Sequence, residues 1–381
     1  MCAVRILYCL VFVVQWAAGQ SFEAQVVDAK VGVGYGLAIG DVDGDKKPDI
    51  LLVDRQRTFW YRNPDWRKRE LTGRLTQRDH VCIAARDIDG DGKVDVAVGG
   101  QWNPGETTDV KKSGSVHVLS RPADDGKDWE AQQLPHEPTV HRMRWVRYGP
   151  GGHALVVVPL HGRGNRGGKG AGVKITAHVR KGGTWVTDVL DDTLHMTHNF
   201  DVVSWYEDYG DELLVASREG VFLLDPGATK WKRRRLVDDA HGGAGEVRLG
   251  RFPSGERFVA VIEPMHGPRA TVYRLRDGKP PLRTVLADDL SQGHAVACAD
   301  LLGLGRDQVV VGWRGRNQAK EVGVRLYVPD ATGDAWTMHW IDRNGMACED
   351  LRVADLNGDG KLDVVAAGRD THNLKIYWNR R

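Results

Sequence analysis

Three copies of a short acidic loop, each followed by an apolar run, constrain what this chain can fold into. The copies are Asp41-Val-Asp43-Gly-Asp45-Lys-Lys-Pro-Asp49, Asp87-Ile-Asp89-Gly-Asp91-Gly-Lys-Val-Asp95 and Asp355-Leu-Asn357-Gly-Asp359-Gly-Lys-Leu-Asp363. Each copy gathers four oxygen-bearing side chains within nine residues. The residues on either side have strand character, unlike the helices that flank an EF-hand loop. A loop that joins two strands and recurs along the chain predicts a repeat architecture.

Calcium is the cation that these loops would bind, because it takes about 6–8 oxygen ligands from carboxylates and backbone carbonyls. Four side-chain oxygens, helped by carbonyls, nearly fill such a site and leave little room for a substrate. We therefore expect three structural calcium sites; the alternative is an acidic turn that binds no cation. The expected ligands are Asp41, Asp43, Asp45 and Asp49; Asp87, Asp89, Asp91 and Asp95; and Asp355, Asn357, Asp359 and Asp363.

A second pattern marks the end of each repeat. Short segments with a large apolar residue at both ends recur at residues 66–71, 129–134, 185–190, 231–236, 282–286 and 336–341. Their ends are separated by 63, 56, 46, 50 and 55 residues, which suits a four-stranded propeller blade. Further strands fit within every repeat, and the whole pattern predicts an all-β, seven-bladed β-propeller.

The seventh repeat stops after its third strand, whereas a segment with the shape of an outer strand, residues 21–27, precedes the first repeat. We expect this N-terminal strand to complete the last blade and close the ring, which removes an exposed sheet edge. Residues 20–381 would then form a single domain. A linear β-solenoid is the alternative, but it gives no reason for this complementarity between the two ends.

The first residues resemble a targeting segment. Arg5 is followed by an apolar stretch over residues 6–16 and by the small residues Ala17-Ala18-Gly19. This predicts a signal peptide over residues 1–19, cleaved near Gly19, and a secreted or periplasmic protein. A membrane anchor, which needs about 20 apolar residues, is the alternative.

Composition narrows the possible partners. The chain is 41% hydrophobic and 27% charged, as soluble globular proteins are. Its net charge of +2 gives no field for nucleic acid, and the basic run at residues 230–235 suits an outer strand protected by charge. We expect no nucleic-acid partner and no membrane span, and the sequence indicates no oligomeric state.

Propeller topology places the loop before each inner strand and the loop after each second strand on the face opposite the acidic loops. The histidines at these positions are His80, His141, His161, His195, His198, His241, His266, His294 and His372. The other polar or aromatic residues there are Tyr35, Gln101, Trp102, Arg163, Arg218, Glu263, Arg314, Glu349 and Arg369. A single histidine is commonly a packing residue, but many converging imidazoles favour a borderline metal such as Zn²⁺, or a proton-transfer site.

Two resemblances follow from these motifs. The acidic loop and its apolar strand resemble the FG-GAP/VCBS repeat of integrin-like propellers. A narrower set of motifs comprises Pro159-Leu-His161-Gly-Arg-Gly-Asn165, His198-Asn-Phe-Asp201, Gly243-Ala-Gly-Glu246, Glu263-Pro-Met-His266-Gly267, Gly293-His294-Ala, Trp313-Arg314, Gly345-Met-Ala-Cys-Glu349 and Ala367-Gly-Arg369-Asp-Thr-His372-Asn373. These resemble the propeller domain of the aldos-2-ulose dehydratase family. The resemblance implies elimination of water from keto-sugars with a divalent metal in the channel.

We therefore expect a secreted carbon–oxygen lyase acting on a keto-sugar or related carbohydrate. A metal held at the channel mouth would polarise the substrate carbonyl. The expected metal ligands are His161, His198, His266, His141 and His241; the expected base is His294, with Glu349 or Tyr35 as the acid; and Arg163, Arg314, Arg369 and His372 would bind sugar hydroxyls. A non-catalytic, calcium-stabilised propeller that binds carbohydrate or protein is the alternative, and polysaccharide cleavage by β-elimination is a third possibility.

Overall fold

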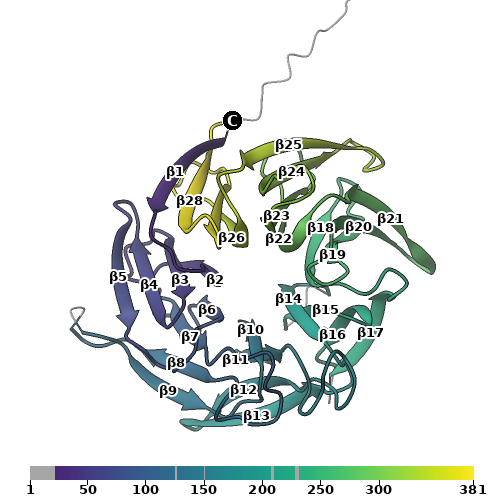
Figure 1. Ribbon diagram of the computed structural model, residues 1–381. Coiled ribbons are helices and arrows are strands. Elements are labelled where there is room, and N and C mark those ends of the chain that lie inside the picture. The colour runs from purple at the N-terminus through teal and green to yellow at the C-terminus, as the bar shows by residue number, and fades with distance from the viewer. Residues whose placement is uncertain (1–21, 125–126, 150, 207–209, 228–230) are drawn as a thin grey trace, which may run out of the picture.

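The computed structural model describes residues 22–124, 127–149, 151–206, 210–227 and 231–381, which form a ring of sheets around a central axis (Figure 1). The described residues contain seven four-stranded sheets and no helix, so the predicted seven-bladed β-propeller is confirmed. Within the same residues there is consequently no helix long and apolar enough to cross a membrane. The predicted signal peptide, residues 1–19, lies outside the described residues and stays a prediction.

The strands follow the chain blade by blade, from the innermost strand outward. Blades 1 to 3 contain β2 (Gly36–Gly40), β3 (Asp49–Asp54), β4 (Arg57–Arg62) and β5 (Arg67–Thr72); β6 (Cys82–Arg86), β7 (Asp95–Gly99), β8 (Val116–Ser120) and β9 (Glu130–Leu134); and β10 (Val140–Arg147), β11 (His153–Pro159), β12 (Ile175–Lys181) and β13 (Thr184–Asp191). Blades 4 to 6 contain β14 (Thr197–Val203), β15 (Glu212–Ser217), β16 (Gly220–Asp225) and β17 (Lys232–Val237); β18 (Glu246–Arg251), β19 (Arg257–Glu263), β20 (Arg269–Arg276) and β21 (Lys279–Ala287); and β22 (Ser291–Ala299), β23 (Gln308–Gly315), β24 (Gly323–Pro329) and β25 (Trp336–Arg343). Blade 7 contains β26 (Cys348–Ala354), β27 (Asp363–Gly368), β28 (Asn373–Asn379) and β1 (Phe22–Asp28).

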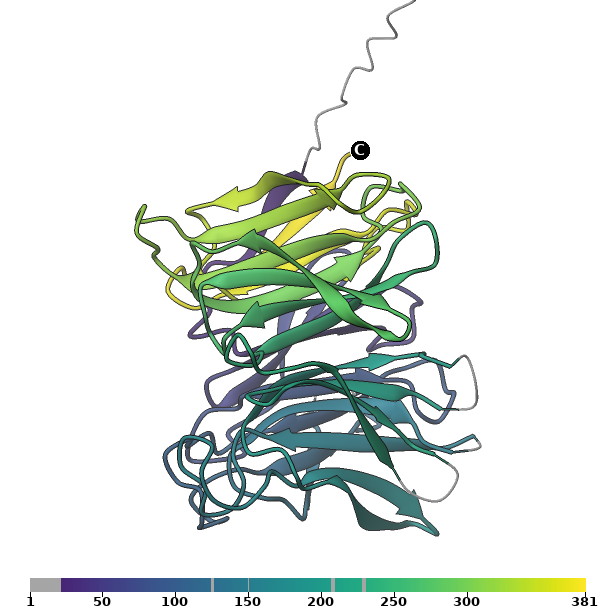
Figure 2. The ribbon, with the colours of Figure 1, turned by 90° about the vertical axis from the view of Figure 1, so that its right-hand side faces the viewer.

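The N-terminal strand closes the ring as predicted. β1 pairs antiparallel with β28, with Phe22 opposite Asn379, and Figure 2 shows the purple strand beside the yellow one. Asp28, at the end of β1, accepts hydrogen bonds of 2.7 Å from the Tyr61 hydroxyl and the Lys68 ammonium. The closing strand therefore completes blade 7 and is also tied to blade 1.

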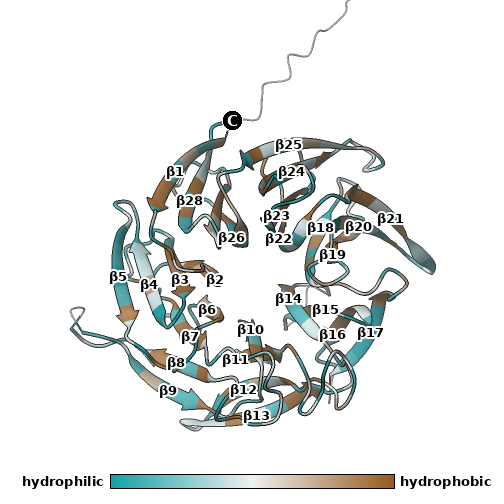
Figure 3. Ribbon diagram, viewed as in Figure 1, coloured by the Kyte–Doolittle hydropathy of each residue, from teal (hydrophilic) through white to brown (hydrophobic). Residues whose placement is uncertain are grey.

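Apolar faces of neighbouring blades hold the ring together. β3, β15 and β27 are buried at every residue, as expected for a sheet covered on both faces. One core cluster joins Leu51 of blade 1, Val96 of blade 2 and Met143 of blade 3. The outer strands β5 and β17 are mostly hydrophilic (Figure 3). The apolar side chains pack between neighbouring blades. The polar residues at the ends of the inner strands therefore face the channel at the axis.

The acidic loops and the expected histidine site occupy opposite ends of the inner strands. The acidic loops lie in the β2–β3, β6–β7 and β26–β27 turns, after the inner strand of blades 1, 2 and 7. His141, His198, His294 and Glu349 lie at or near the starts of β10, β14, β22 and β26.

Candidate active site at the channel mouth

Four inner strands carry a β-bulge at the residue that the sequence placed at the channel mouth. The pairing of first and second strands shifts at His141 in blade 3, at His198 and Asn199 in blade 4, at His294 in blade 6 and at Glu349 in blade 7. The inner strands of blades 1, 2 and 5 pair with their second strands in an unbroken register. A bulge leaves a residue unpaired and re-aims its side chain. The bulges therefore take these side chains out of the strand alternation, and they turn the three histidines toward the next blade.

Each of the bulged histidines donates a hydrogen bond to the inner edge of the following blade. The Nδ1–H groups donate to backbone carbonyls: His141 to His198 at 2.7 Å, His198 to Gly245 at 3.0 Å, and His294 to Glu349 at 2.5 Å. A carbonyl oxygen can only accept, so Nδ1 must carry the proton. The lone pair of each neutral ring is consequently on Nε2. This fixed tautomer is the second-shell arrangement typical of metal-binding histidines.

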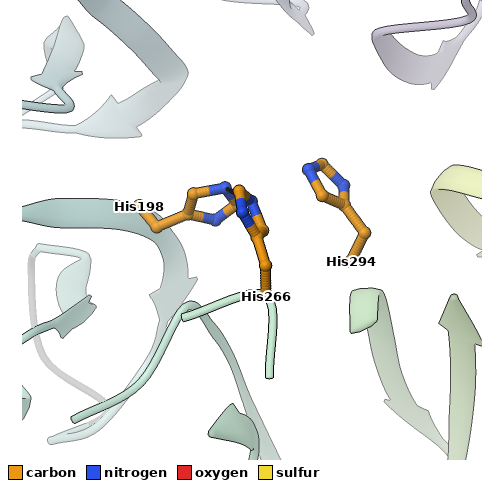
Figure 4. Close-up of side chains that lie close together, drawn as sticks. All are labelled: His198, His266 and His294. Carbon is orange, nitrogen blue, oxygen red and sulfur yellow. Dashed lines mark hydrogen bonds between the residues drawn. The ribbon is translucent and has the colours of Figure 1, made fainter. Parts of the chain in front are cut away.

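Three of these imidazoles converge. His198, His266 and His294 offer ring nitrogens that all lie within 4.8 Å of one another, and Figure 4 shows their rings turned toward a common point. The Nε2 atoms of His198 and His266 are 2.6 Å apart, and the His294 ring centroid lies 5.0 Å from that of His266. Because His198 has its lone pair on Nε2, the neutral His266 ring can donate to it from Nε2–H, and a cation bound by both rings would take the place of that proton.

A tight turn after β19 delivers His266 to this group. His266 has a φ of +52°, a left-handed conformation that few non-glycine residues adopt. A Cβ on the following residue, Gly267, would lie 2.4 Å from the Glu263 carbonyl oxygen. Only glycine allows so close a turn, and backbone strain of this kind concentrates at functional sites.

Burial keeps the three histidines neutral. It lowers the pKa of His198 and of His294 well below the ordinary value of 6.5, and with His198 nearby it lowers the pKa of His266 to about 2. Neutral imidazoles are the form that binds metal. Three nitrogen ligands with a further open position are the donor set of many catalytic zinc sites. His198, His266 and His294 could therefore hold a divalent cation such as Zn²⁺.

Glu246 is a neighbour of this group to which the sequence gave no role. Its Oε1 lies 3.1 Å from Nδ1 of His198, and its Oε2 accepts a 2.7 Å hydrogen bond from Asn199. It is 1% exposed, and burial raises its pKa. A carboxylate beside a histidine raises the basicity of that ligand. The sequence could have indicated Glu246 as a site residue by its position at the start of β18, because the equivalent position in other blades is occupied by a histidine or by Glu349.

A second polar cluster lies beside His294. Glu349 accepts hydrogen bonds from Nη1 of Arg314, 2.9 Å to either oxygen, and from Nη1 of Arg369 at 3.0 and 3.2 Å. The nearest oxygen of Glu349 is 3.8 Å from Nε2 of His294. Arg314 and Arg369, expected to bind sugar hydroxyls, thus each hold this buried carboxylate, and Arg314 also donates from Nε to Gln292 at 3.0 Å.

Tyr35 extends the same cluster. Its hydroxyl donates a 3.0 Å hydrogen bond to Asp79, and the Arg369 guanidinium lies 5.6 Å from its ring centroid. Burial, followed by the charge of Asp79, raises the pKa of Tyr35 to about 12. The phenol therefore keeps its proton at neutral pH, as a general acid or hydrogen-bond donor requires.

The other predicted site residues are arranged around this centre. His141 is adjacent, its ring centroid 4.5 Å from that of His198. Of the described residues, the three-histidine group includes neither His161 nor His241. His161 forms an isolated bridge with Met196, and His241 is exposed.

Two predicted sugar-binding residues make contacts of their own. Arg163 pairs with Glu137 at 2.9 Å, and His372 donates from Nδ1 to the Gly32 carbonyl at 3.0 Å. The roles predicted for Arg163 and His372, like those for His161 and His241, stay predictions.

Comparison with known protein families finds two matching segments in this chain. Residues 35–98 match the FG-GAP-like repeat, and residues 113–276 match the β-propeller domain of aldos-2-ulose dehydratase. The resemblance predicted from the motifs is confirmed. Aldos-2-ulose dehydratase of Phanerodontia chrysosporium is 26% identical over 360 residues, 85% of this chain. The chain spans only 38% of that protein's length.

Solved structures agree on the fold. A chain in the crystal structure of BBS1N in complex with ARL6DN has a TM-score of 0.59 at 14% identity, covering 95% of this chain and 97% of that one. A chain of the Mitotic Checkpoint Complex has a TM-score of 0.59 at 11% identity, covering 98% and 99%. At such identities the likeness shows the propeller fold alone.

The family match bears on the site itself. His198 and His266 lie within residues 113–276, the segment that matches the β-propeller domain of aldos-2-ulose dehydratase.

The acidic loops bring carboxylates together on the other face. Asp41, Asp43 and Asp45 form one group with oxygens within 4.8 Å of one another, and Asp87, Asp89 and Asp95 form another. The last aspartate of each loop also closes the turn: in the first loop, Asp49 is buried and accepts hydrogen bonds of 2.8 Å from the amides of Val42 and Asn63.

Asp363 accepts equivalent bonds from Leu356 and Asn379 in the third loop. The expected ligands Asp91, Asp355, Asn357 and Asp359 are in the same loops, and calcium binding remains a prediction.

Removing calcium should destabilise the protein. A cation that binds only the folded state contributes about 2.7 kcal/mol per site at a hundredfold excess over Kd. Adding EGTA should therefore lower the melting temperature, measured by calorimetry, and Asp89→Ala should reproduce part of the decrease and reduce the response to EGTA. Asp300, in the β22–β23 turn of blade 6, accepts hydrogen bonds from the backbone amides of Leu304 and Gly305 and from the side chain of Gln308. Asp300→Ala is the control and should leave the EGTA response unchanged; a wild type insensitive to EGTA would contradict the prediction.

Proposed function

We propose that this chain is a carbon–oxygen lyase that eliminates water from a keto-sugar or related carbohydrate at the channel mouth. The supporting observation is the group formed by His198, His266 and His294, two of which lie in the segment similar to a dehydratase propeller. From the N-terminal segment we also propose that the protein is secreted or periplasmic.

In this proposal, His198, His266 and His294 hold a divalent cation such as Zn²⁺. The cation, when bound, supplies Lewis-acid polarisation of the substrate carbonyl, which makes the neighbouring C–H more acidic. Glu246, against the far side of His198, strengthens that ligand. His294, expected from the sequence to be a base, is assigned to the cation because its Nε2 faces the other two imidazoles.

His141 then takes the α-proton. It is the neutral imidazole adjacent to the group, and burial lowers its pKa well below 6.5, so it is unprotonated at neutral pH. Arg142 Nη1, 3.1 Å from His141 Nε2, fixes the ring until substrate binds. Tyr35, which keeps its proton, gives it to the departing hydroxyl, and Arg314 and Arg369 orient the sugar.

The proposal is tested by turnover of the wild-type protein. Elimination of water from a 2-keto or 3-keto sugar produces an enone, which is seen as new ultraviolet absorbance. The protein, supplied with Zn²⁺, Mg²⁺ or Mn²⁺, should turn over at least one sugar of such a panel. Binding of glycans without any turnover would instead support a non-catalytic FG-GAP-type propeller, and cleavage of an acidic polysaccharide would support a polysaccharide lyase.

A further inference from the structure

The three acidic loops have the same backbone shape. In each loop, the first aspartate accepts hydrogen bonds from the amides of the fourth and sixth residues. The distances are 2.7 and 2.7 Å to Asp41 in blade 1, 2.7 and 2.9 Å to Asp87 in blade 2, and 2.8 and 2.8 Å to Asp355 in blade 7. The sixth residue has a positive φ in all three loops, and it is Lys46 in blade 1 but a glycine in the other two. A difference in cation affinity between the loops is therefore a matter of charge rather than of backbone shape.

The loop of blade 1 differs because basic side chains already occupy two of its carboxylates. Nε of Arg62 lies 2.9 Å from an oxygen of Asp43, and Nζ of Lys47 lies 3.5 Å from an oxygen of Asp45. The aspartates of the other two loops form no ion pair with a basic side chain that the structure describes. They are Asp87, Asp89, Asp91 and Asp95 in blade 2, and Asp355, Asp359 and Asp363 in blade 7.

Strand register explains why Arg62 is particular to blade 1. The residue after the last aspartate of each loop pairs with the third strand of its blade, at Tyr61, Leu119 and Tyr377. The next residues along these strands are Arg62, Ser120 and Trp378. Neither serine nor tryptophan carries a charge, so this position adds a cation beside the loop only in blade 1.

Arg62 lies in a hollow that offers it no other counter-charge. The hollow has a volume of about 800 Å³, and the carboxylates among its described lining residues are those of Asp43 and Asp45. Arg67 and Arg69, on the neighbouring strand β5, line it as well. Calcium bound to the loop would take both carboxylates and would leave three guanidiniums beside a divalent cation, which costs electrostatic energy.

We propose that Arg62 competes with calcium for Asp43 and makes the loop of blade 1 the weakest of the three calcium sites. The inference rests on the prediction that the acidic loops bind calcium, and it is independent of the proposed lyase activity. Calcium affinity depends on the charge of the ligands and spans several decades among protein sites. The Arg62 side chain is 50% exposed. An ion pair this exposed is weak, so we expect a difference of roughly 10-fold rather than complete exclusion of calcium.

The test is a calcium titration of the protein by isothermal titration calorimetry. The wild type should show two tighter sites and a third whose dissociation constant is about 10-fold higher. Arg62→Gln should tighten the third site by about the same factor, whereas Arg62→Lys, which keeps the charge, should leave it weak. Asp43→Asn should remove the weak site only, and Asp89→Asn should remove one of the tighter sites.

Arg57→Gln is the matched control. Arg57 lies at the other end of β4 from Arg62 and pairs with Glu70, so this variant should leave all three sites unchanged. Circular dichroism without calcium shows whether each variant is folded. Three equal sites in the wild type, an unchanged weakest site in Arg62→Gln, or loss of a tighter site in Asp43→Asn would overturn the proposal. A wild type that binds no calcium would overturn it as well, whatever its activity on keto-sugars.

Discussion

Replacing His266 with alanine is expected to remove both the bound divalent metal and any lyase activity. His266 supplies one of three converging ring nitrogens, and its Nε2 lies 2.6 Å from that of His198. Loss of an outer-shell partner typically weakens metal binding about 10–100-fold, and loss of a direct ligand should exceed that range. The metal content of the purified variant, measured by mass spectrometry, should fall to background. The melting temperature should change no more than for a typical point mutant, about 1 kcal/mol.

Two matched histidine variants make this result specific. His241 is exposed and lies outside the three-histidine group, so His241→Ala should retain both metal and turnover. His141→Ala should retain the metal but lose turnover, because we assign it to proton removal. If His266→Ala keeps its full metal content, the three-histidine site is wrong; if His241→Ala loses metal, the broader ligand set expected from the sequence is right.

The architecture was predictable because it is encoded locally and repeatedly. Apolar runs such as residues 50–53 and 364–367 are long enough for strands buried on both faces, and each is set off by a turn rich in glycine and aspartate. The missing outer strand of blade 7 and the extra strand at Phe22–Asp28 fit each other, and the two strands pair in the structure. Such signals need no knowledge of long-range register.

The sequence predicted only some of the residues that form the site. The propeller topology predicts that His198, His266 and His294 lie at one mouth of the channel, as they do in the structure. His161 and His266 both follow second strands, yet only His266 joins the three-histidine group. His266 follows a turn that Gly267 permits, whereas His161 is held by a bridge to Met196. The bulges at His141, His294 and Glu349 depend on pairing with a strand many residues away, which a one-dimensional pattern does not specify.

The arginines illustrate the same limit. Arg314 and Arg369 were expected to bind sugar hydroxyls because arginine commonly binds polar ligands. The sequence did not show that the buried carboxylate of Glu349 would pair with both arginines. Glu349 is 2% exposed. A buried carboxylate is tolerated only with its charge compensated and its oxygens hydrogen-bonded, and the two arginines provide both.

Replacing Glu349 with alanine should therefore be among the most destabilising single changes at the channel mouth. The substitution removes four hydrogen bonds from Arg314 and Arg369 and leaves two guanidiniums without their counter-charge. Breaking a buried ion pair on one side costs about 3–5 kcal/mol, and the partial exposure of Arg369 favours the lower end of that range. Urea denaturation should show a lower midpoint with an unchanged slope.

An exposed pair of the same chemistry provides the comparison. Glu23 pairs with Arg380 at 2.7 Å, but the two side chains are 63% and 46% exposed, so Glu23→Ala should cost about 0–1 kcal/mol. Adding Arg314→Met to Glu349→Ala should recover part of the loss, because it removes one of the two stranded cations and substitutes an apolar side chain. Equal losses for Glu349→Ala and Glu23→Ala would show that burial does not set the strength of this cluster. No recovery in the double variant would show that Glu349 stabilises the mouth through its backbone bulge or its packing rather than through charge.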